Sequence, residues 1–400
     1  MVLLLFGIIF PLATLHADPS GASKDKRKTV KRPYTPTSPW NLRIGPDPAY
    51  DSLSDQLIQS LEGHFGCDPT QYTYPVYDDI DEDTPRRKVT VTGVVSDVTD
   101  DGSDLAVRKN TTVEVPIPGT PKPSRGTDGQ VIFTDPRTGD EWGFWRFRKK
   151  GDGSFVAQNG YHYNTNWSGV PPLGFVSRGA GVPYLAGLVR PEEIRQGRIK
   201  HALVFGTPDP SALFAYPATK SDGDAKLPAI PEGARLQLDP DLTEKDFERW
   251  GLSRAGKIIA RALQEYGMIL VDGSGHPKIY VEDHHTAQWE GILHPRTVSP
   301  IPYSAFRVLD LNAEKKPSPP DNLRAKTNKT SVTLRWEASP SATRYWIQRQ
   351  GREKQWVTCN DWVTETSFKD EETQPGTTPV YAVRAVNHNG VSERATVEIK

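Results

Sequence analysis

The chain has 400 residues, a quarter of them charged, and a formal net charge of −1. This length is enough for two or three domains, and the near-neutral charge gives no global attraction for nucleic acid, so a nucleic-acid partner is not expected. The 35 prolines and 33 glycines, together with runs in which apolar and polar residues alternate, are typical of a mainly β protein.

Residues 1–17 have the outline of a secretory signal peptide. The apolar run from Val2 to Phe10 is too short to span a membrane, and Leu15-His16-Ala17 offers a cleavage site, although the usual basic start is missing. A short membrane anchor or an incorrectly chosen start codon would also explain this run. We expect a secreted, cell-surface or periplasmic protein that is not inserted in a membrane after processing.

Residues 18–37 are rich in lysine, serine, threonine and proline. This composition cannot bury a core and predicts a disordered basic spacer.

Residues 38–312 are predicted to form one β-rich domain. The spacing of Leu53, Leu57, Ile58 and Leu61 predicts a first helix, and the clearest helix lies between Ser253, which can cap it, and Tyr266. Alternating or buried patterns predict strands in 72–77, 88–98, 113–118, 131–133, 141–148, 201–205, 214–217, 234–238, 268–272 and 278–282. Few helices and many short strands favour a β-sandwich or jelly roll with helical insertions.

Metal sites are not expected. Cys67 and Cys359 are too few for a disulfide framework or a zinc site; free thiols are favoured over a pair across a domain interface. The aspartates around Gly102 (Asp97, Asp100, Asp101, Asp104) do not have the spacing of a helix–loop–helix calcium loop, which favours a solvated turn.

A histidine cluster follows the last predicted strand of this domain. His284 and His285 would point to opposite faces of a strand and so are not expected to share a metal ion, whereas Glu282, His284 and His294 could. The overall prediction is no metal and no cofactor. Motifs of serine hydrolases, zinc proteases and nucleotide-binding enzymes are absent from the sequence, which disfavours those classes.

Residues 313–320 have the composition of a linker, and strands then recur about every ten residues through 321–400, as in a small sandwich. The segments Pro319–Leu323, Leu334-Arg335-Trp336, Tyr345–Arg349, Pro375-Gly376-Thr377 and Tyr381–Gly390 resemble the fibronectin type III family in their order. The resemblance implies that Trp336 and Tyr381 are core residues. Such modules commonly act as spacers or attachment units in secreted bacterial enzymes that act on polymers.

The large domain resembles a family of secreted bacterial and fungal proteins without an assigned activity. The resemblance covers most of 38–310 and rests on Ser38-Pro39-Trp40-Asn41, Gly187-Leu188-Val189-Arg190, Glu193, His201-Ala202-Leu203, Tyr216-Pro217-Ala218, Arg261-Ala262-Leu263, Tyr266-Gly267-Met268 and Asp272. It implies one exported domain and supplies no mechanism.

Polar, titratable and aromatic residues concentrate between Tyr161 and Asp239. The predicted catalytic residues are His201, Arg190 and Glu193. The predicted substrate-binding residues are Tyr161, Tyr163, Asn166, Trp167, Tyr216, Lys220 and Arg235. Each also has a purely structural interpretation, such as a core aromatic, a turn former or a solvated loop.

This set of residues suits carbohydrate chemistry. Glycoside hydrolysis needs paired carboxylates, for which Glu192 or Glu193 with Asp222, Asp239 or Asp272 are candidates. Uronate elimination needs a base and a cation that offsets the substrate carboxylate, and the abundance of cations and histidine favours this reaction somewhat. We therefore expect a secreted carbohydrate-active protein that degrades an extracellular polysaccharide, as hydrolase or lyase. The alternatives are a non-catalytic cell-surface or extracellular glycan-binding protein and a purely structural envelope protein.

Overall fold

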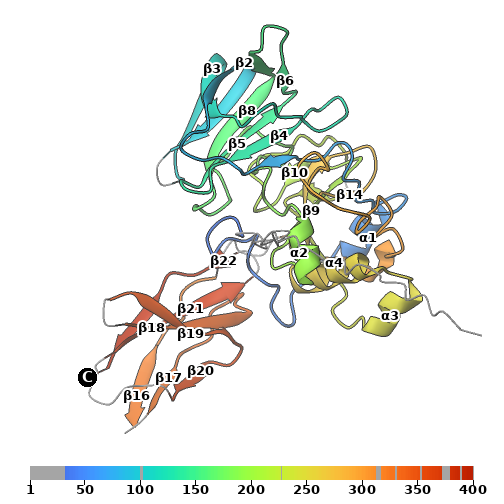
Figure 1. Cartoon of the computed structure of the whole chain (residues 1–400). Coiled ribbons are helices and arrows are strands. Elements are labelled where there is room, and N and C mark those ends of the chain that lie inside the picture. Colours follow the sequence, from blue (N-terminus) through green and yellow to red (C-terminus); the bar gives the residue numbers. More distant parts are fainter. Residues whose placement is uncertain are drawn as a thin grey trace, which may run out of the picture.

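The computed structural model describes residues 32–99, 102–226, 228–311, 317–328, 331–351, 354–371, 379–387 and 390–399. The protein is mainly β, as predicted, and its strands form several sheets with few helices (Figure 1). No helix in the described part of the chain is long and apolar enough to cross a membrane.

An eight-stranded sheet forms the first part of the large domain. Its order is β1-β4-β5-β8-β2-β7-β6, with β3 paired to β2. The strands are β1 (Val76–Tyr77), β2 (Arg86–Val98), β3 (Leu105–Pro116), β4 (Val131–Thr134), β5 (Asp140–Trp145), β6 (Arg148–Lys149), β7 (Phe155–Ala157) and β8 (Asn159–Asn164). The alternation in β2 buries Val89 and Val91 and exposes Thr90. The predicted hairpin of β4 and β5 is confirmed.

A five-stranded mixed sheet forms the second part. Its order is β14 (Lys278–Ile279), β9 (Leu203–Thr207), β13 (Met268–Gly273), β12 (Arg235–Leu238) and β15 (Phe306–Val308), and β9 runs parallel to β13. A separate parallel pair, β10 (Ser211–Phe214) and β11 (Pro231–Glu232), lies beside it.

Helices lie against the five-stranded sheet and contribute to its core. They are α1 (Ser54–Gln59), α2 (Pro191–Gln196), α3 (Glu244–Arg249), α4 (Arg254–Glu265) and the short η1 (Tyr303–Ala305). Both predicted helices are confirmed, and Ser253 caps α4 by accepting a hydrogen bond from Gly256 N at 3.2 Å. α2 and α3 have only six residues each, too few for the periodicity to predict them.

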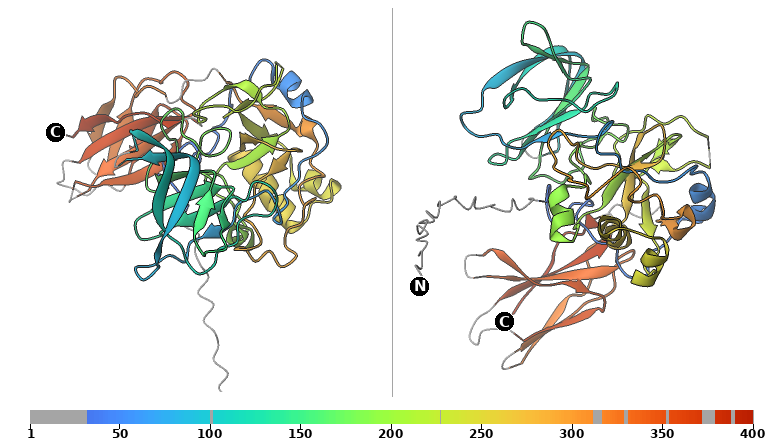
Figure 2. Two further views of the ribbon diagram at one scale, coloured as in Figure 1. Left: turned by 90° about the horizontal axis from the view of Figure 1, so that it is seen from above. Right: turned by 45° about the vertical axis from the view of Figure 1, so that its right-hand side comes forward.

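The C-terminal strands form two sheets around a separate core. Figure 2 shows these sheets beside the large domain. One sheet contains β16 (Arg324–Asn328), β17 (Ser331–Arg335) and β20 (Ser367–Asp370). The other contains β18 (Arg344–Gln350), β19 (Trp356–Val363), β21 (Val380–Asn387), β22 (Gly390–Val391) and β23 (Ala395–Glu398). Trp336 and Tyr381 are buried in this core, as predicted.

The predicted spacer over 18–37 extends too far at its C-terminal end. Tyr34 is buried in the large domain, and its hydroxyl donates to Glu141 Oε2 at 3.0 Å. Burying one aromatic ring compensates for the polar composition around it. The rest of the predicted spacer up to Lys31, the predicted signal peptide and residues 313–316 of the predicted linker lie outside the described residues.

Candidate active site: a carboxylate centre

Glu232 is a carboxylate placed in the interior by a tight backbone arrangement. It lies in β11, its side chain is fully buried, and Oε1 has no hydrogen-bond partner among the described residues. Ala215 N donates to its carbonyl at 2.8 Å. The next residue, Gly233, has φ +88°, and a Cβ there would lie 1.8 Å from Ala215 O. Only glycine allows this close approach.

Two further carboxylates join Glu232. Asp272 lies near the carboxyl end of β13, and Asp222 N donates to Glu232 Oε2 at 3.3 Å. Carboxylate oxygens of Asp222, Glu232 and Asp272 lie within 4.8 Å of one another. We call these three residues and Lys220 the carboxylate centre.

The backbone at Gly179 closes the carboxylate centre on one side. Gly179 N donates to Asp272 Oδ1 at 3.2 Å, and Lys220 Nζ donates to Gly179 O at 2.6 Å. A Cβ at Gly179 would lie 2.2 Å from Glu232 Oε1 and 2.5 Å from Asp222 Oδ1. The glycine is therefore required for the backbone to reach the carboxylates.

Burial and mutual repulsion raise the pKa of Glu232 more than the pKa of Asp272. Burial, followed by the charges of Asp222 and Asp272, raises the pKa of Glu232 to about 8. Burial, followed by Asp222, raises the pKa of Asp272 to about 6, and Arg178 limits this rise. Near neutral pH, Glu232 keeps its proton and Asp272 is mostly ionised, which is the division that acid–base catalysis needs.

Arg178 provides a buried cation near these acids. It is 3% exposed, and its Nη2 donates to Pro183 O at 2.6 Å, while Nε and Nη1 have no hydrogen-bond partner in the described residues. Its guanidinium lies 4.9 Å from the centroid of the Tyr74 ring and 5.7 Å from that of Tyr184. This cation favours the ionised form of Asp272.

Two groups in the described residues have the spacing of metal ligands: the three carboxylates, and Asp283 with His284 and His285. In the first group, Lys220 already supplies a positive charge that lowers the pKa of Glu232. We therefore interpret the carboxylate centre as a proton-transfer site.

The three predicted catalytic residues come together elsewhere, at the start of α2. His201 Nε2 lies 3.1 Å from Glu193 Oε1, and Glu193 also accepts a hydrogen bond from Arg190 N at 3.0 Å, which caps the helix. Arg190 Nε donates to Glu282, and Nη2 donates to Asp78 Oδ2 at 3.2 Å. Burial alone would lower the pKa of His201, but Glu193 raises it. These residues line a hollow of about 440 Å³.

Most of the predicted substrate-binding residues pack in the core or form hydrogen bonds within the fold. Tyr161 and Tyr163 are fully buried, so the prediction that their rings stack on sugar is wrong for this structure: core side chains cover them. Trp167 is partly buried against Tyr163, and Asn166 donates to Thr138 O at 3.2 Å. Arg235 is buried and donates to Pro39 O at 2.5 Å. Its positive charge partly offsets the rise that burial causes in the pKa of Tyr216. Lys220 alone reaches the carboxylate centre.

Two smaller sequence predictions concern cysteine and calcium. Cys67 is buried, its Sγ contacts His294 O at 3.3 Å, and no disulfide joins it to Cys359 in the described chain. Asp97 lies on β2 and pairs with His162 at 2.9 Å and with Arg108 at 3.1 Å. Asp100 and Asp101 lie outside the described residues.

Sequence reasoning does not select Glu232, and it offers Asp222 and Asp272 only as alternative carboxylates for hydrolysis. The available signal was a single acid in the otherwise apolar run Ala229-Ile230-Pro231-Glu232-Gly233. An acid at such a position must be either paired or functional.

No protein-family model matches this chain, and no curated protein matches it. A solved structure described as an Fn3-like protein from Clostridium thermocellum is 25% identical over 21% of this chain and 92% of that chain, with a TM-score of 0.20. The FN5 domain of Drosophila Lar is 24% identical over 20% and 95%, with a TM-score of 0.18. The fn3 domain of human collagen alpha-1(XX) is 20% identical over 22% and 88%, also with a TM-score of 0.18. These three matches are to fibronectin type III domains and concern about a fifth of the chain.

Proposed function

We propose that the large domain is a secreted enzyme that hydrolyses glycosidic bonds in an extracellular carbohydrate polymer at the carboxylate centre. The observation that carries the proposal is the pair of Glu232 and Asp272, in which one acid is protonated and the other mostly ionised near neutral pH. Export is supported by the apolar N-terminal run alone.

The roles follow from the two protonation states. Glu232 donates its proton to the glycosidic oxygen as the bond from that oxygen to the anomeric carbon breaks. Asp272 acts on the opposite side of the bond, as nucleophile or as the base that activates water. Retaining glycosidases hold the two carboxyl groups about 5–5.5 Å apart, and inverting ones about 6.5–9.5 Å. One oxygen from each acid lies within 4.8 Å of the other, a limit nearer to the retaining range than to the inverting one.

A polymer substrate is supported by an exposed apolar strand next to Glu232. In the β10–β11 pair, Phe214 is the register partner of Glu232 and is 46% exposed, and its neighbour Leu213 is 61% exposed. The apolar faces of sugar rings stack on such side chains, and large exposed apolar residues on one strand mark a binding surface.

The C-terminal sandwich fits this function as an accessory unit. We assign it as a fibronectin type III module over 321–400, on the order of its motifs and its two-sheet architecture. Its role in the proposal is to separate the large domain from an attachment point or from the polymer.

The test is a panel of polysaccharides incubated with the purified full chain, with reducing ends and the ultraviolet absorbance of unsaturated uronates followed together. We expect reducing ends without absorbance, and kcat reduced about 100-fold or more in Glu232→Gln and in Asp272→Asn. The matched control is Glu62→Gln, because Glu62 is exposed and far along the chain from the carboxylate centre.

Other outcomes separate the alternatives. Absorbance together with reducing ends would indicate elimination, and Lys220 and His201 would then be the candidate catalytic residues. Binding to a glycan without turnover, unchanged in Glu232→Gln, would contradict the enzyme and support the glycan-binding protein.

A further inference from the structure

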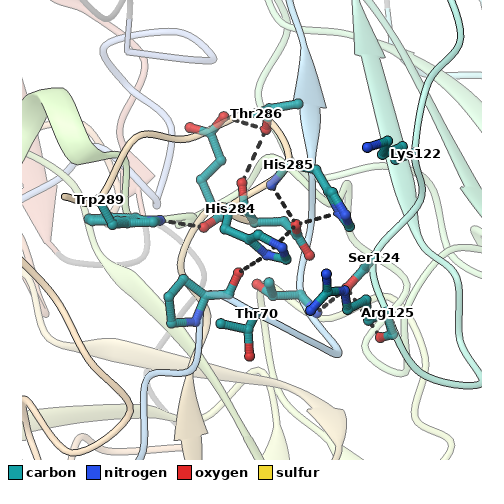
Figure 3. A network of polar contacts seen from close by, with 12 residues as sticks. Thr70, Lys122, Ser124, Arg125, His284, His285, Thr286 and Trp289 are labelled. Carbon is teal, nitrogen blue, oxygen red and sulfur yellow. Dashed lines mark hydrogen bonds and ion pairs between the residues drawn. The ribbon is translucent and has the colours of Figure 1, made fainter. Parts of the chain in front are cut away.

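A second cluster of chemically active side chains lies in the turn that follows Glu282. Asp283 N donates to Tyr74 O at 3.1 Å, and Val76 N donates to Thr286 Oγ1 at 2.9 Å, so the turn is fixed against the segment that leads into β1. Figure 3 shows His284 and His285 side by side in this turn.

The expectation that these two histidines point to opposite faces of a strand is therefore wrong. The chain turns at Asp283, and the two ring centroids are 4.2 Å apart. His294, the third histidine considered from the sequence, binds within its own segment, where its Nδ1 accepts from Arg296 N at 3.2 Å.

The Asp283 carboxylate is fully buried, and only one of its two oxygens accepts a hydrogen bond from the described residues. Its Oδ1 accepts a hydrogen bond from His285 N at 2.9 Å. Its Oδ2 has no hydrogen-bond partner among the described residues. An unpaired, buried carboxylate oxygen is costly, so a cation at this position would account for it.

Both imidazoles lie against the Asp283 carboxylate: His284 Nδ1 is 3.2 Å and His285 Nδ1 is 2.9 Å from Asp283 Oδ1, and one possible ligand atom of each of the three residues lies within 4.8 Å of the others. His284 Nδ1 bonds to Pro69 O at 3.1 Å; because a carbonyl only accepts, this nitrogen carries the hydrogen and Nε2 keeps a lone pair. His285 Nδ1 is buried without a hydrogen bond, although it lies 2.9 Å from Asp283 Oδ1. Two atoms bound to one zinc ion at about 2.1 Å lie about 3.0–3.4 Å apart, close to this separation.

Figure 3 shows two basic side chains, Lys122 and Arg125, near the histidines. Lys122 and Arg125 are exposed, so water and salt screen their repulsion of a metal ion. Two imidazoles and one carboxylate suit zinc better than calcium or magnesium, which prefer oxygen ligands.

We propose that Asp283, His284 and His285 form a binding site for a divalent transition-metal ion of the zinc type. Three protein ligands leave a fourth position for water or an anionic group. Because the turn is bonded to Tyr74 O and Val76 N, the ion would strengthen the connection between the turn and the eight-stranded sheet.

The experiment is calorimetric titration of the chelator-treated full chain with Zn²⁺, together with the visible absorption of the Co²⁺ form. We expect one ion per chain, a tetrahedral cobalt spectrum and a higher Tm with zinc. His285→Ala and Asp283→Asn should each weaken zinc binding about 100-fold and abolish the Tm increase. The matched control is His64→Ala, which removes an exposed histidine outside the cluster.

Three results would overturn the proposal. One is the absence of saturable zinc binding to the wild-type chain. Another is an equal loss of binding in His64→Ala. The third is binding of inorganic phosphate but not zinc, lost in Lys122→Ala and Arg125→Ala, because this would identify an anion site. If His285→Ala fails to fold, His284→Ala gives the decisive measurement, since the His284 side chain is 31% exposed.

Discussion

Two buried glutamates show how a single residue can be assigned to structure or to chemistry. Glu141 is fully buried and accepts hydrogen bonds from Tyr161 Oη at 2.5 Å, Tyr34 Oη at 3.0 Å and Leu185 N at 3.2 Å. Glu232 is equally buried, but its Oε1 lacks a hydrogen-bond partner in the described chain. The satisfied acid holds the N-terminal segment in place, and the unsatisfied one is the candidate for chemistry.

The raised pKa of Glu232 predicts a specific dependence of stability on pH. The folded-state pKa is about 8, against 4.5 for an ordinary glutamate. Between these values the folded chain keeps a proton that the unfolded chain releases, so the free energy of unfolding falls as pH rises, by up to about 1.4 kcal/mol per pH unit. Glu232→Gln cannot titrate and should show a shallower decline, measured by urea unfolding at pH 5, 6, 7 and 8.

The control for this measurement is Glu62→Gln, which should follow the wild-type curve. If Glu232→Gln also keeps the full wild-type slope, the proton is not held at Glu232 and the assignment of the general acid fails.

His201, Glu193 and Arg190 show that proximity of candidate residues is not enough to decide a role. The structure brings them together, but Glu193 caps α2 and pairs with His201, and Arg190 pairs with two acids. Their catalytic role stays a prediction, to be tested only if the carboxylate variants retain activity.

At the scale of elements, α4 leads into the start of β13, the strand that carries Asp272 near its other end. Ile259 and Leu263 of α4 are fully buried, and the helix leads directly into β13. β13 is held between β9 and β12, so the carboxyl end of the strand has one position. Sites built on such rigid elements keep their geometry well.

The cap of α4 can be tested directly. Ser253→Ala removes the acceptor for Gly256 N and should lower the free energy of unfolding by about 1 kcal/mol. The shift of the urea midpoint measures this effect. Ser304→Ala serves as the control, because Ser304 is exposed and belongs to no α-helix; equal shifts for the two variants would contradict the cap.

Periodicity predicted some elements and not others for a clear reason. α4 has twelve residues and a complete apolar stripe, and the β4–β5 hairpin has long alternation, so local pattern was sufficient. α2 has six residues and begins at the hydrogen bond that Arg190 N donates to Glu193 Oε2, rather than showing an apolar stripe. The turn at Asp283 is held by bonds to Tyr74 and Pro69, more than 200 residues earlier in the chain, which no local pattern shows.

At the scale of the whole molecule, the C-terminal sandwich packs on the segment that begins the large domain. Leu42 forms a small apolar cluster with Val386 and Val391, and Arg344 Nη1 donates to Arg43 O at 2.9 Å. Gly45 lies directly against Thr343: a Cβ at Gly45 would be 2.1 Å from Thr343 Oγ1. The two domains therefore meet through a contact that leaves no room for a methyl group.

Gly45→Ala should separate the sandwich from the large domain without unfolding either. The clash involves a side chain held by its bond to Val386 O, so we expect a larger radius of gyration in small-angle X-ray scattering and little change in circular dichroism. Gly151→Ala is the control, because no described heavy atom lies within 4 Å of its added Cβ. Combining Gly45→Ala with Thr343→Gly should restore compactness; an unchanged radius in Gly45→Ala alone would show that the contact does not hold the domains.

The sequence by itself determined the mainly β class, the long helix, the β4–β5 hairpin and the core positions of Trp336 and Tyr381, because each depends on periodicity or on the order of nearby motifs. It also identified Lys220, Asp222 and Asp272 as possible site residues, without indicating that they meet. Only the tertiary structure placed them around Glu232, since Gly179, the β10–β11 pair and β13 come from distant segments. Their altered pKa values arise from that shared burial, which is a property of the assembled fold and not of any residue alone.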